Sequence, residues 1–217
     1  MVRSCRFENE GAKTMLCWLT ATQARPRTVL FLDRDGVINR DRPDYVKSWR
    51  EVQFYPDALE ALAWLWQNDC GVILISNQSG LNRGIIDSNR FWDLHHRMIA
   101  HIRLMGGNVL AAFYCPHRPD ENCRCRKPSP EMILLAGRLY DISPAESYYI
   151  GDRRSDILAA RRAGCRAVLL ERPGEDPGGQ TETHDDLCRP DLRCATLLDA
   201  VFAVRDEFVP KAASSEA

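Results

Sequence analysis

Short apolar runs alternate along the chain with longer segments in which apolar residues recur every three or four positions. The runs have the length and near-continuous hydrophobicity of strands that are buried on both faces, and they are 28–32, 71–75, 109–114, 147–150 and 166–170. The helical spacing is found at 57–68, 88–105, 130–140, 155–163 and 196–207. This alternation predicts an α/β fold with a doubly wound, Rossmann-like parallel sheet.

Capping and breaking residues set the expected ends of these elements. We expect Ser88 to cap the longest helix, Gly106 to end it, and Pro130 to open the next one. The segment 172–189 is rich in Pro, Gly and acidic residues and is predicted to be a loop. Residues 1–27 are expected to form a loosely attached extension, 28–210 a single domain and 211–217 a tail.

Bulk composition narrows the class of protein. The 217 residues carry a formal net charge of -1 and are 45% hydrophobic, which is typical of a soluble globular domain and gives no argument for binding nucleic acid. The chain contains no apolar run near the roughly 18 residues of a membrane helix, and the apolar patch at 15–19 is too short for a signal peptide. We therefore expect a cytoplasmic protein with reduced cysteines.

Two carboxylates stand at the end of the first predicted strand. Asp33 and Asp35 follow the apolar run 29–32 and precede Gly36. Ligands of open α/β sheets bind at the carboxyl ends of the strands. There, one carboxylate can attack a substrate while the other transfers protons, and a divalent cation can bind beside them.

Other predicted strands deliver polar groups to the same edge. Ser76 and Asn77 end the second strand, Asp152 ends the fourth, and Lys127 lies between the third and the fourth. A nucleophile, an acid/base, a cation site and donors for phosphoryl oxygens are what phosphoryl transfer requires. The combination therefore predicts a phosphoryl-transfer site.

Each motif alone has a simpler interpretation. An aspartate pair before a glycine also occurs in calcium loops, but an EF-hand would need glycine at Ile38 and a bidentate glutamate at Asp44. Ser76-Asn77 and the segment 151–156 could merely cap helices. The histidines His95, His96 and His101 lack the i, i+4 spacing of a metal face and are expected on the surface or in packing contacts.

A second cluster combines soft metal ligands. Cys115, His117, Cys123 and Cys125 fall within eleven residues, which predicts a tetrahedral, structural Zn²⁺ site. A disulfide is disfavoured because Cys123 and Cys125 are too close to pair without strain. Lys127 follows the last ligand by two residues, so the metal would fix the position of its side chain.

Four ordered motifs, read together, resemble the phosphatases of the haloacid dehalogenase superfamily, and within it the histidinol-phosphatase-like subfamily. The motifs are Asp33-Arg-Asp35-Gly-Val-Ile-Asn39, Ser76-Asn77-Gln78-Ser79-Gly80, Arg126-Lys127-Pro128 and Gly151-Asp152-Arg153-Arg-Ser-Asp156. The resemblance implies a Mg²⁺-dependent phosphomonoester hydrolase of the haloacid dehalogenase fold. Because no large insertion follows 35 or separates the second and third strands, we expect it to lack a cap domain.

The resemblance also implies a role for each matching residue. Asp33 would be the nucleophile that becomes an aspartyl phosphate, and Asp35 the acid/base. Mg²⁺ would be held by Asp33, by the backbone carbonyl of Asp35 and by Asp152. Ser76 would hydrogen-bond the phosphoryl oxygens, and Lys127 would neutralise their charge. Asp156 would orient its neighbours rather than bind the metal.

The substrate is expected to be a small phosphorylated metabolite bound by a monomer. In the segments 36–39 and 77–84, the resemblance favours a heptose bisphosphate of lipopolysaccharide synthesis, with histidinol phosphate as the alternative. A catalytically silent, phosphometabolite-binding protein is the non-enzymatic alternative. The residues expected to face the substrate are Asp41, Tyr45, Ser76, Asn77, Gln78, Ser79, Arg126, Lys127 and Arg153.

Overall fold

The computed structural model describes residues 3–9, 13–20, 26, 28–174 and 188–207. They form one eight-stranded sheet in the order β1-β2-β5-β4-β3-β6-β7-β8. Six neighbouring strands run parallel: β3 (Thr28–Leu32), β4 (Cys70–Asn77), β5 (Ala111–Cys115), β6 (Tyr148–Gly151), β7 (Arg166–Leu170) and β8 (Leu192–Cys194). The predicted parallel α/β sheet is confirmed for this part.

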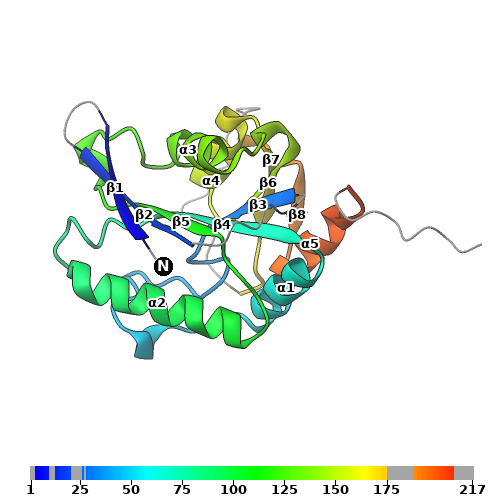
Figure 1. Cartoon of the computed structure of the whole chain (residues 1–217), viewed down its shortest axis with the longest axis horizontal. Helices are drawn as coiled ribbons and strands as arrows, with labels where there is room; N and C mark the ends of the chain where they lie inside the picture. The colour runs from blue at the N-terminus through cyan, green and yellow to red at the C-terminus, as the bar shows by residue number, and fades with distance from the viewer. Residues whose placement is uncertain (1–2, 10–12, 21–25, 27, 175–187, 208–217) are drawn as a thin grey trace, which may run out of the picture.

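Helices cover both faces of the sheet (Figure 1). One face carries α1 (Pro56–Gln67), α2 (Ser88–Leu104) and α5 (Leu197–Val204), and the other carries α3 (Glu131–Tyr140) and α4 (Arg154–Ala163). Two buried hydrophobic clusters correspond to these two faces. The central strands are mostly apolar because both of their faces are covered.

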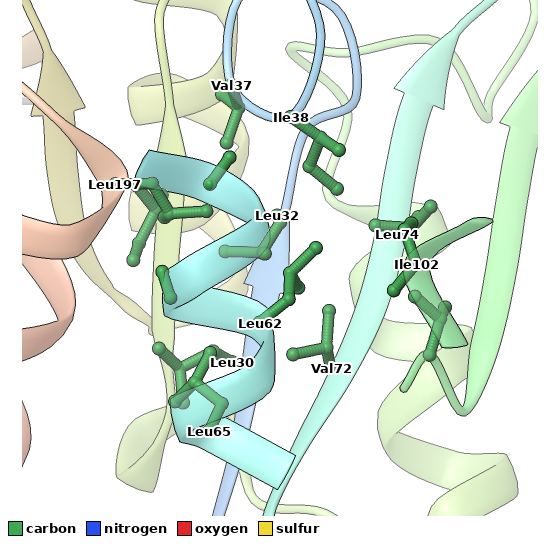
Figure 2. Close-up of a cluster of buried hydrophobic side chains, with 14 of the residues drawn as sticks. Leu30, Leu32, Val37, Ile38, Leu62, Leu65, Val72, Leu74, Ile102 and Leu197 are labelled. Carbon is green, nitrogen blue, oxygen red and sulfur yellow. The ribbon is translucent and has the colours of Figure 1, made fainter. Parts of the chain in front are cut away.

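The first cluster shows how a helical pattern meets the sheet. Figure 2 shows Leu62 of α1 beside Leu32 of β3 and Val72 of β4. All three side chains are at most 1% exposed. Burying each contributes roughly 1.5–3 kcal/mol, so this packing fixes α1 against the strands that deliver the polar site.

The beginning of the chain departs from the expected loose extension. β2 (Lys13–Leu19) pairs antiparallel with β5, and β1 (Arg3–Asn9) pairs antiparallel with β2. Met15, Cys17 and Trp18 are buried against the two clusters. The prediction was wrong for 13–19 because its apolar residues are too few to suggest a helix or signal peptide, yet suffice for a strand between β1 and β5.

Smaller corrections concern the helix ends and one missed strand. The side chain of Asp87, not Ser88, caps α2 by accepting hydrogen bonds from Asn89 N and Arg90 N at 3.0 Å each. The short strand β8 was missed within a stretch that has little apolar pattern. Within the described residues, no helix is both long and apolar enough to cross a membrane.

Strand order places the site. From β3 the chain builds outward through β4 and β5 on one side, and then returns to add β6, β7 and β8 on the other. The carboxyl ends of β3, β4 and β6 therefore meet where the direction of winding reverses, which is the usual ligand site of such sheets.

Candidate active site

The aspartate pair is held by a tight turn after β3. Ile38 N donates to Arg34 O at 2.8 Å, and Gly36 N donates to Asn39 O at 2.7 Å. Gly36 has a φ of 80°, and a Cβ at this position would lie 2.1 Å from Asp152 Oδ2. Only glycine fits both the backbone conformation and the close approach of that carboxylate.

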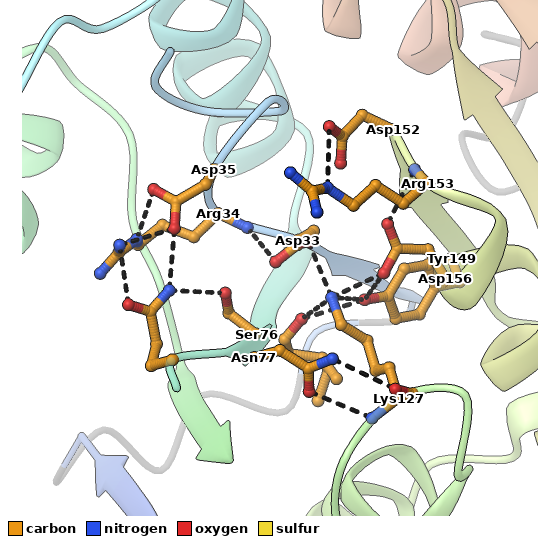
Figure 3. A network of polar contacts seen from close by, with 12 residues as sticks. Asp33, Arg34, Asp35, Ser76, Asn77, Lys127, Tyr149, Asp152, Arg153 and Asp156 are labelled. Atoms are coloured by element: carbon orange, nitrogen blue, oxygen red, sulfur yellow. Dashed lines mark hydrogen bonds and ion pairs between the residues drawn. The ribbon is translucent and has the colours of Figure 1, made fainter. Parts of the chain in front are cut away.

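Lys127 connects Asp33 to the end of β6. Its ammonium lies 2.8 Å from Asp33 Oδ2 and 2.6 Å from Asp156 Oδ1, and it donates to Ile75 O at 3.0 Å and to Tyr149 Oη at 3.1 Å. Burial alone would lower the pKa of Lys127, but the neighbouring carboxylates outweigh burial and raise it. The cation is therefore fixed beside Asp33 (Figure 3).

Three carboxylates gather around this lysine. Oxygen atoms of Asp33, Asp152 and Asp156 all lie within 4.8 Å of one another. Burial and the charges of Asp156 and Asp33 raise the pKa of Asp152 well above its usual range. A hard divalent cation relieves such crowding and prefers oxygen ligands, so the donor set fits Mg²⁺. Asp156 also accepts from Arg153 N at 3.0 Å, which agrees with an orienting role.

Asp35 points away from this cluster into a set of donors (Figure 3). Arg34 donates to both carboxylate oxygens, from Nε to Oδ1 at 3.0 Å and from Nη2 to Oδ2 at 2.7 Å. Asn39 Nδ2 donates to Oδ1 and Gln78 Nε2 to Oδ2, both at 2.8 Å. Burial raises the pKa of Asp35, but Arg34 and these hydrogen bonds outweigh burial and lower it.

The polar residues at the end of β4 and directly after it lie at this site, and several of their side chains hydrogen-bond to other residues of the protein. Ser76 Oγ accepts from Gln78 Nε2 at 3.0 Å and is buried. Asn77 holds the backbone of Lys127 from both sides: Asn77 Nδ2 donates to Lys127 O at 3.2 Å, and Lys127 N donates to Asn77 Oδ1 at 3.1 Å. Thus Gln78 orients Asp35 and Asn77 orients Lys127.

The other residues predicted to face the substrate are Asp41, Tyr45, Ser79, Arg126 and Arg153, and each of them contacts another part of the protein. Tyr45 and Ser79 are 3.1 Å apart at their hydroxyls, and Tyr45 has a φ of 67°. Arg153, which follows Asp152, pairs with Asp41. Arg126 donates to His117 O at 3.1 Å and so belongs to the cysteine-rich loop.

That loop brings together all four predicted zinc ligands. The ligand atoms of Cys115, His117, Cys123 and Cys125 lie within 4.8 Å of one another. Cys115 Sγ and Cys125 Sγ approach His117 Nδ1 at 3.4 and 3.3 Å. Hydrogen bonding to Cys125 and burial raise the pKa of the Cys115 thiol. Coordination to a cation would lower this pKa and stabilise the thiolate. The donor set fits a closed tetrahedral zinc site.

Sequence reasoning missed four residues around this site. Arg34 lies between the two aspartates, and Asn39 ends the same motif. Tyr149 lies within an apolar strand, and its hydroxyl donates to Ile75 O at 3.0 Å. Arg172 donates to Gly36 O and Val37 O at 3.2 and 3.0 Å. Of these four residues, only Arg34 and Asn39 could have been predicted from the sequence, because they lie inside the motif 33–39 at the end of a strand.

Comparison with known proteins agrees with this geometry. The HAD-hydrolase-like family model matches residues 124–200. D-glycero-beta-D-manno-heptose-1,7-bisphosphate 7-phosphatase of Bordetella bronchiseptica is 43% identical over 66% of this chain and 80% of its own length. The enzyme of the same name from Helicobacter pylori is 35% identical, over 72% of this chain and 91% of its own length.

Solved structures of phosphatases are also similar to this chain. The D,D-heptose 1,7-bisphosphate phosphatase of B. bronchiseptica, crystallised with magnesium and phosphate, superposes with a TM-score of 0.76 at 38% identity. The superposition includes 83% of this chain and 99% of the B. bronchiseptica chain. A putative HAD-like phosphatase of Mesorhizobium loti superposes with a TM-score of 0.74 at 26% identity. The superposition includes 91% of this chain and 95% of that protein's chain.

A parallel α/β sheet with an aspartate pair, a lysine and clustered carboxylates at its switch point defines a phosphatase of the haloacid dehalogenase superfamily. The relatives place the chain more narrowly. It belongs to the family of the D-glycero-β-D-manno-heptose-1,7-bisphosphate 7-phosphatases.

Proposed function

We propose that this protein hydrolyses the 7-phosphate of D-glycero-β-D-manno-heptose 1,7-bisphosphate. The observation that carries the proposal is the contact of Lys127 Nζ with Asp33 Oδ2 at 2.8 Å, on a chain that is 43% identical to a phosphatase of that name. A buried lysine beside a strand-end carboxylate is suited to accept a phosphoryl dianion directly in front of a nucleophile.

In the first half-reaction, a carboxylate oxygen of Asp33 attacks phosphorus and the bond from phosphorus to the sugar oxygen breaks. Asp35 gives its proton to that leaving oxygen. Lys127 offsets the negative charge of the phosphoryl group, and the Ser76 hydroxyl donates to one of its oxygens. The products are the sugar alcohol and an aspartyl phosphate on Asp33.

In the second half-reaction, Asp35 removes a proton from water, whose oxygen attacks phosphorus. The bond between phosphorus and Asp33 breaks, which releases inorganic phosphate and restores the carboxylate. The donors around Asp35 favour its carboxylate form, which is the form that this base step uses. Mg²⁺, held by Asp33, the Asp35 carbonyl and Asp152, would supply further positive charge beside the phosphoryl oxygens.

Cys115, His117, Cys123 and Cys125 are proposed to bind one structural Zn²⁺. The support is their mutual distance and the position of Cys125 two residues before Lys127. Elemental analysis of the purified protein tests this proposal. One zinc per chain is expected, falling below one-tenth in Cys125→Ser; wild-type zinc content in that variant would contradict the assignment.

Substrate recognition is assigned to the other residues predicted to face the substrate. Without a cap domain, Asp41, Tyr45, Ser79, Arg126 and Arg153 are the groups that a sugar bisphosphate would meet beyond the reacting phosphate. The two arginines provide the positive charge that a second phosphate requires. We further expect a cytoplasmic monomer, and sedimentation at micromolar concentration checks the oligomeric state.

Phosphate release with Mg²⁺ tests the proposed substrate. We expect kcat/KM for the heptose 1,7-bisphosphate to exceed that for histidinol phosphate by at least a hundredfold. A higher value for histidinol phosphate would replace the substrate while preserving the reaction. If the protein binds either compound but releases no phosphate from any monoester, it is a silent binding protein and the proposal fails.

A further inference from the structure

Arg34 is a buried cation that the chemistry above does not use. Its side chain is 2% exposed, although it belongs to the turn that carries both aspartates. It points away from the lysine-centred cluster and toward Asp35 (Figure 3). Burying a guanidinium is costly unless it is paired and hydrogen-bonded, so its contacts identify what it does.

The guanidinium forms a two-pronged pair with Asp35. Nε donates to Oδ1 at 3.0 Å and Nη2 donates to Oδ2 at 2.7 Å. This parallel arrangement fixes the plane of the carboxylate as well as its distance, which a lysine ammonium cannot do. Asp35 is thereby held in one orientation before substrate arrives.

The Arg34 guanidinium, whose two-pronged pair with Asp35 is called the fork, also hydrogen-bonds to a third residue. Arg34 Nη2 also donates to Gln78 Oε1 at 3.0 Å, while the Gln78 amide donates to Asp35 Oδ2 at 2.8 Å and to Ser76 Oγ at 3.0 Å. Arg34, Gln78 and Asp35 therefore form a closed ring of hydrogen bonds. Asn39 Nδ2 completes the set on Oδ1 at 2.8 Å.

Four donors fill the roughly four lone-pair positions of the Asp35 carboxylate. A proton that Asp35 gives to a leaving oxygen must occupy one of these positions, so one donor has to withdraw. The neutral amides of Gln78 and Asn39 can withdraw at lower cost than the charged fork. Arg34 then keeps the carboxyl plane fixed while the proton is transferred.

We propose that Arg34 is a positioning residue that sets the orientation of Asp35 for proton transfer to the leaving group. The inference rests on the acid role given to Asp35 in the proposed function. Arg34 acts through Asp35 and does not touch the substrate, so its loss should matter only when the leaving group needs a proton.

Two probe substrates of similar size separate proton donation from everything else. p-Nitrobenzyl phosphate leaves as an alkoxide that requires a proton, whereas p-nitrophenyl phosphate leaves as a stable phenolate that does not. The parameter to compare is kcat/KM with Mg²⁺, which reports steps up to the first irreversible one. Neither probe depends on recognition of a heptose.

Arg34→Gln removes the charge and the fork, and Arg34→Lys keeps the charge but loses the fork. For both variants we expect kcat/KM to fall about tenfold to a hundredfold with p-nitrobenzyl phosphate and less than threefold with p-nitrophenyl phosphate. Arg97→Gln, at an exposed arginine of α2 paired with Asp93, is the matched control and should leave both values unchanged.

Equal losses on both probes, or wild-type values on both, would overturn the proposal. If Arg34→Gln does not fold, Arg34→Lys alone decides, because it retains the buried charge. Asp35→Asn separates this inference from the proposed function. If that variant shows no leaving-group dependence, the acid role of Asp35 is wrong; if it does and the Arg34 variants do not, only the role of Arg34 is wrong.

Discussion

His95 makes the stability of the fold dependent on pH in a way that can be calculated. Its ring lies under the sheet, 1% exposed, with Nδ1 2.8 Å from the Tyr114 hydroxyl and with Trp18 at a ring-centroid distance of 4.9 Å. Burial, followed by the charges of His96 and Arg34, lowers the pKa of His95 to about 3. The folded protein therefore keeps this imidazole neutral.

The sign of the effect follows from the two pKa values. The unfolded chain has a histidine pKa of about 6.5, so between pH 6.5 and 3 it binds a proton that the folded chain does not. Stability from His95 is complete above pH 6.5 and is lost as the pH falls toward 3. Between pH 7.5 and pH 5 the loss is about 2 kcal/mol.

Urea unfolding followed by tryptophan fluorescence at pH 7.5 and pH 5.0 measures this loss. We expect the decrease in unfolding free energy to be about 2 kcal/mol larger in the wild type than in His95→Gln, because other titrating groups are common to both. His96→Gln, at an exposed position, should keep most of the wild-type decrease, because burial lowers the pKa of His95 more than the charge of His96 does. An equal decrease in the wild type and His95→Gln would refute the burial argument.

Two further substitutions test the supports of the site. Gly36→Ala should raise the Mg²⁺ concentration needed for half-maximal activity at least tenfold, because the new Cβ would lie 2.1 Å from Asp152 Oδ2. Gly84→Ala is the control: Gly84 has a similar φ of 68°, but a Cβ there would meet no atom within 4 Å, so this concentration should stay unchanged. An equal shift in both variants would assign the effect to backbone strain. Arg172→Gln should lower the unfolding free energy by about 2 kcal/mol, since Arg172 pairs with Asp57 at 3.0 Å and holds the Gly36 and Val37 carbonyls. Unchanged urea midpoints would show that this contact contributes nothing.

The parallel part of the sheet could be predicted because strands buried on both faces have a simple signature. β3 and β7 were located at their observed ends from apolar residues alone. β8 could not be found in this way, because it is a short edge strand that buries little surface and its pattern is correspondingly weak. β2 lies between β1 and β5, and it was missed although Met15, Cys17 and Trp18 are buried. Pairing with a distant strand, as β2 does with β5, leaves no local trace.

The site shows the same division between local and distant information. Asp33, Asp152 and Lys127 were expected at one edge because strand ends converge there, and they lie together. The use of Gln78 as a partner of Asp35 was not predicted, since it depends on side-chain directions across 43 residues of sequence. Arg34 was not predicted as a site residue, because an arginine between two aspartates at a strand end is expected to be exposed, whereas its side chain is buried.

The most direct test of the central claim is a rapid acid quench of the wild-type enzyme with the heptose bisphosphate and Mg²⁺, followed by peptide mass spectrometry. We expect a phosphoryl group on the peptide that contains Asp33, lost on treatment with hydroxylamine. Asp33→Asn should form no such adduct and release no phosphate. A phosphoryl group on a different residue, or wild-type phosphate release by Asp33→Asn, would contradict the assignment of Asp33 as the nucleophile.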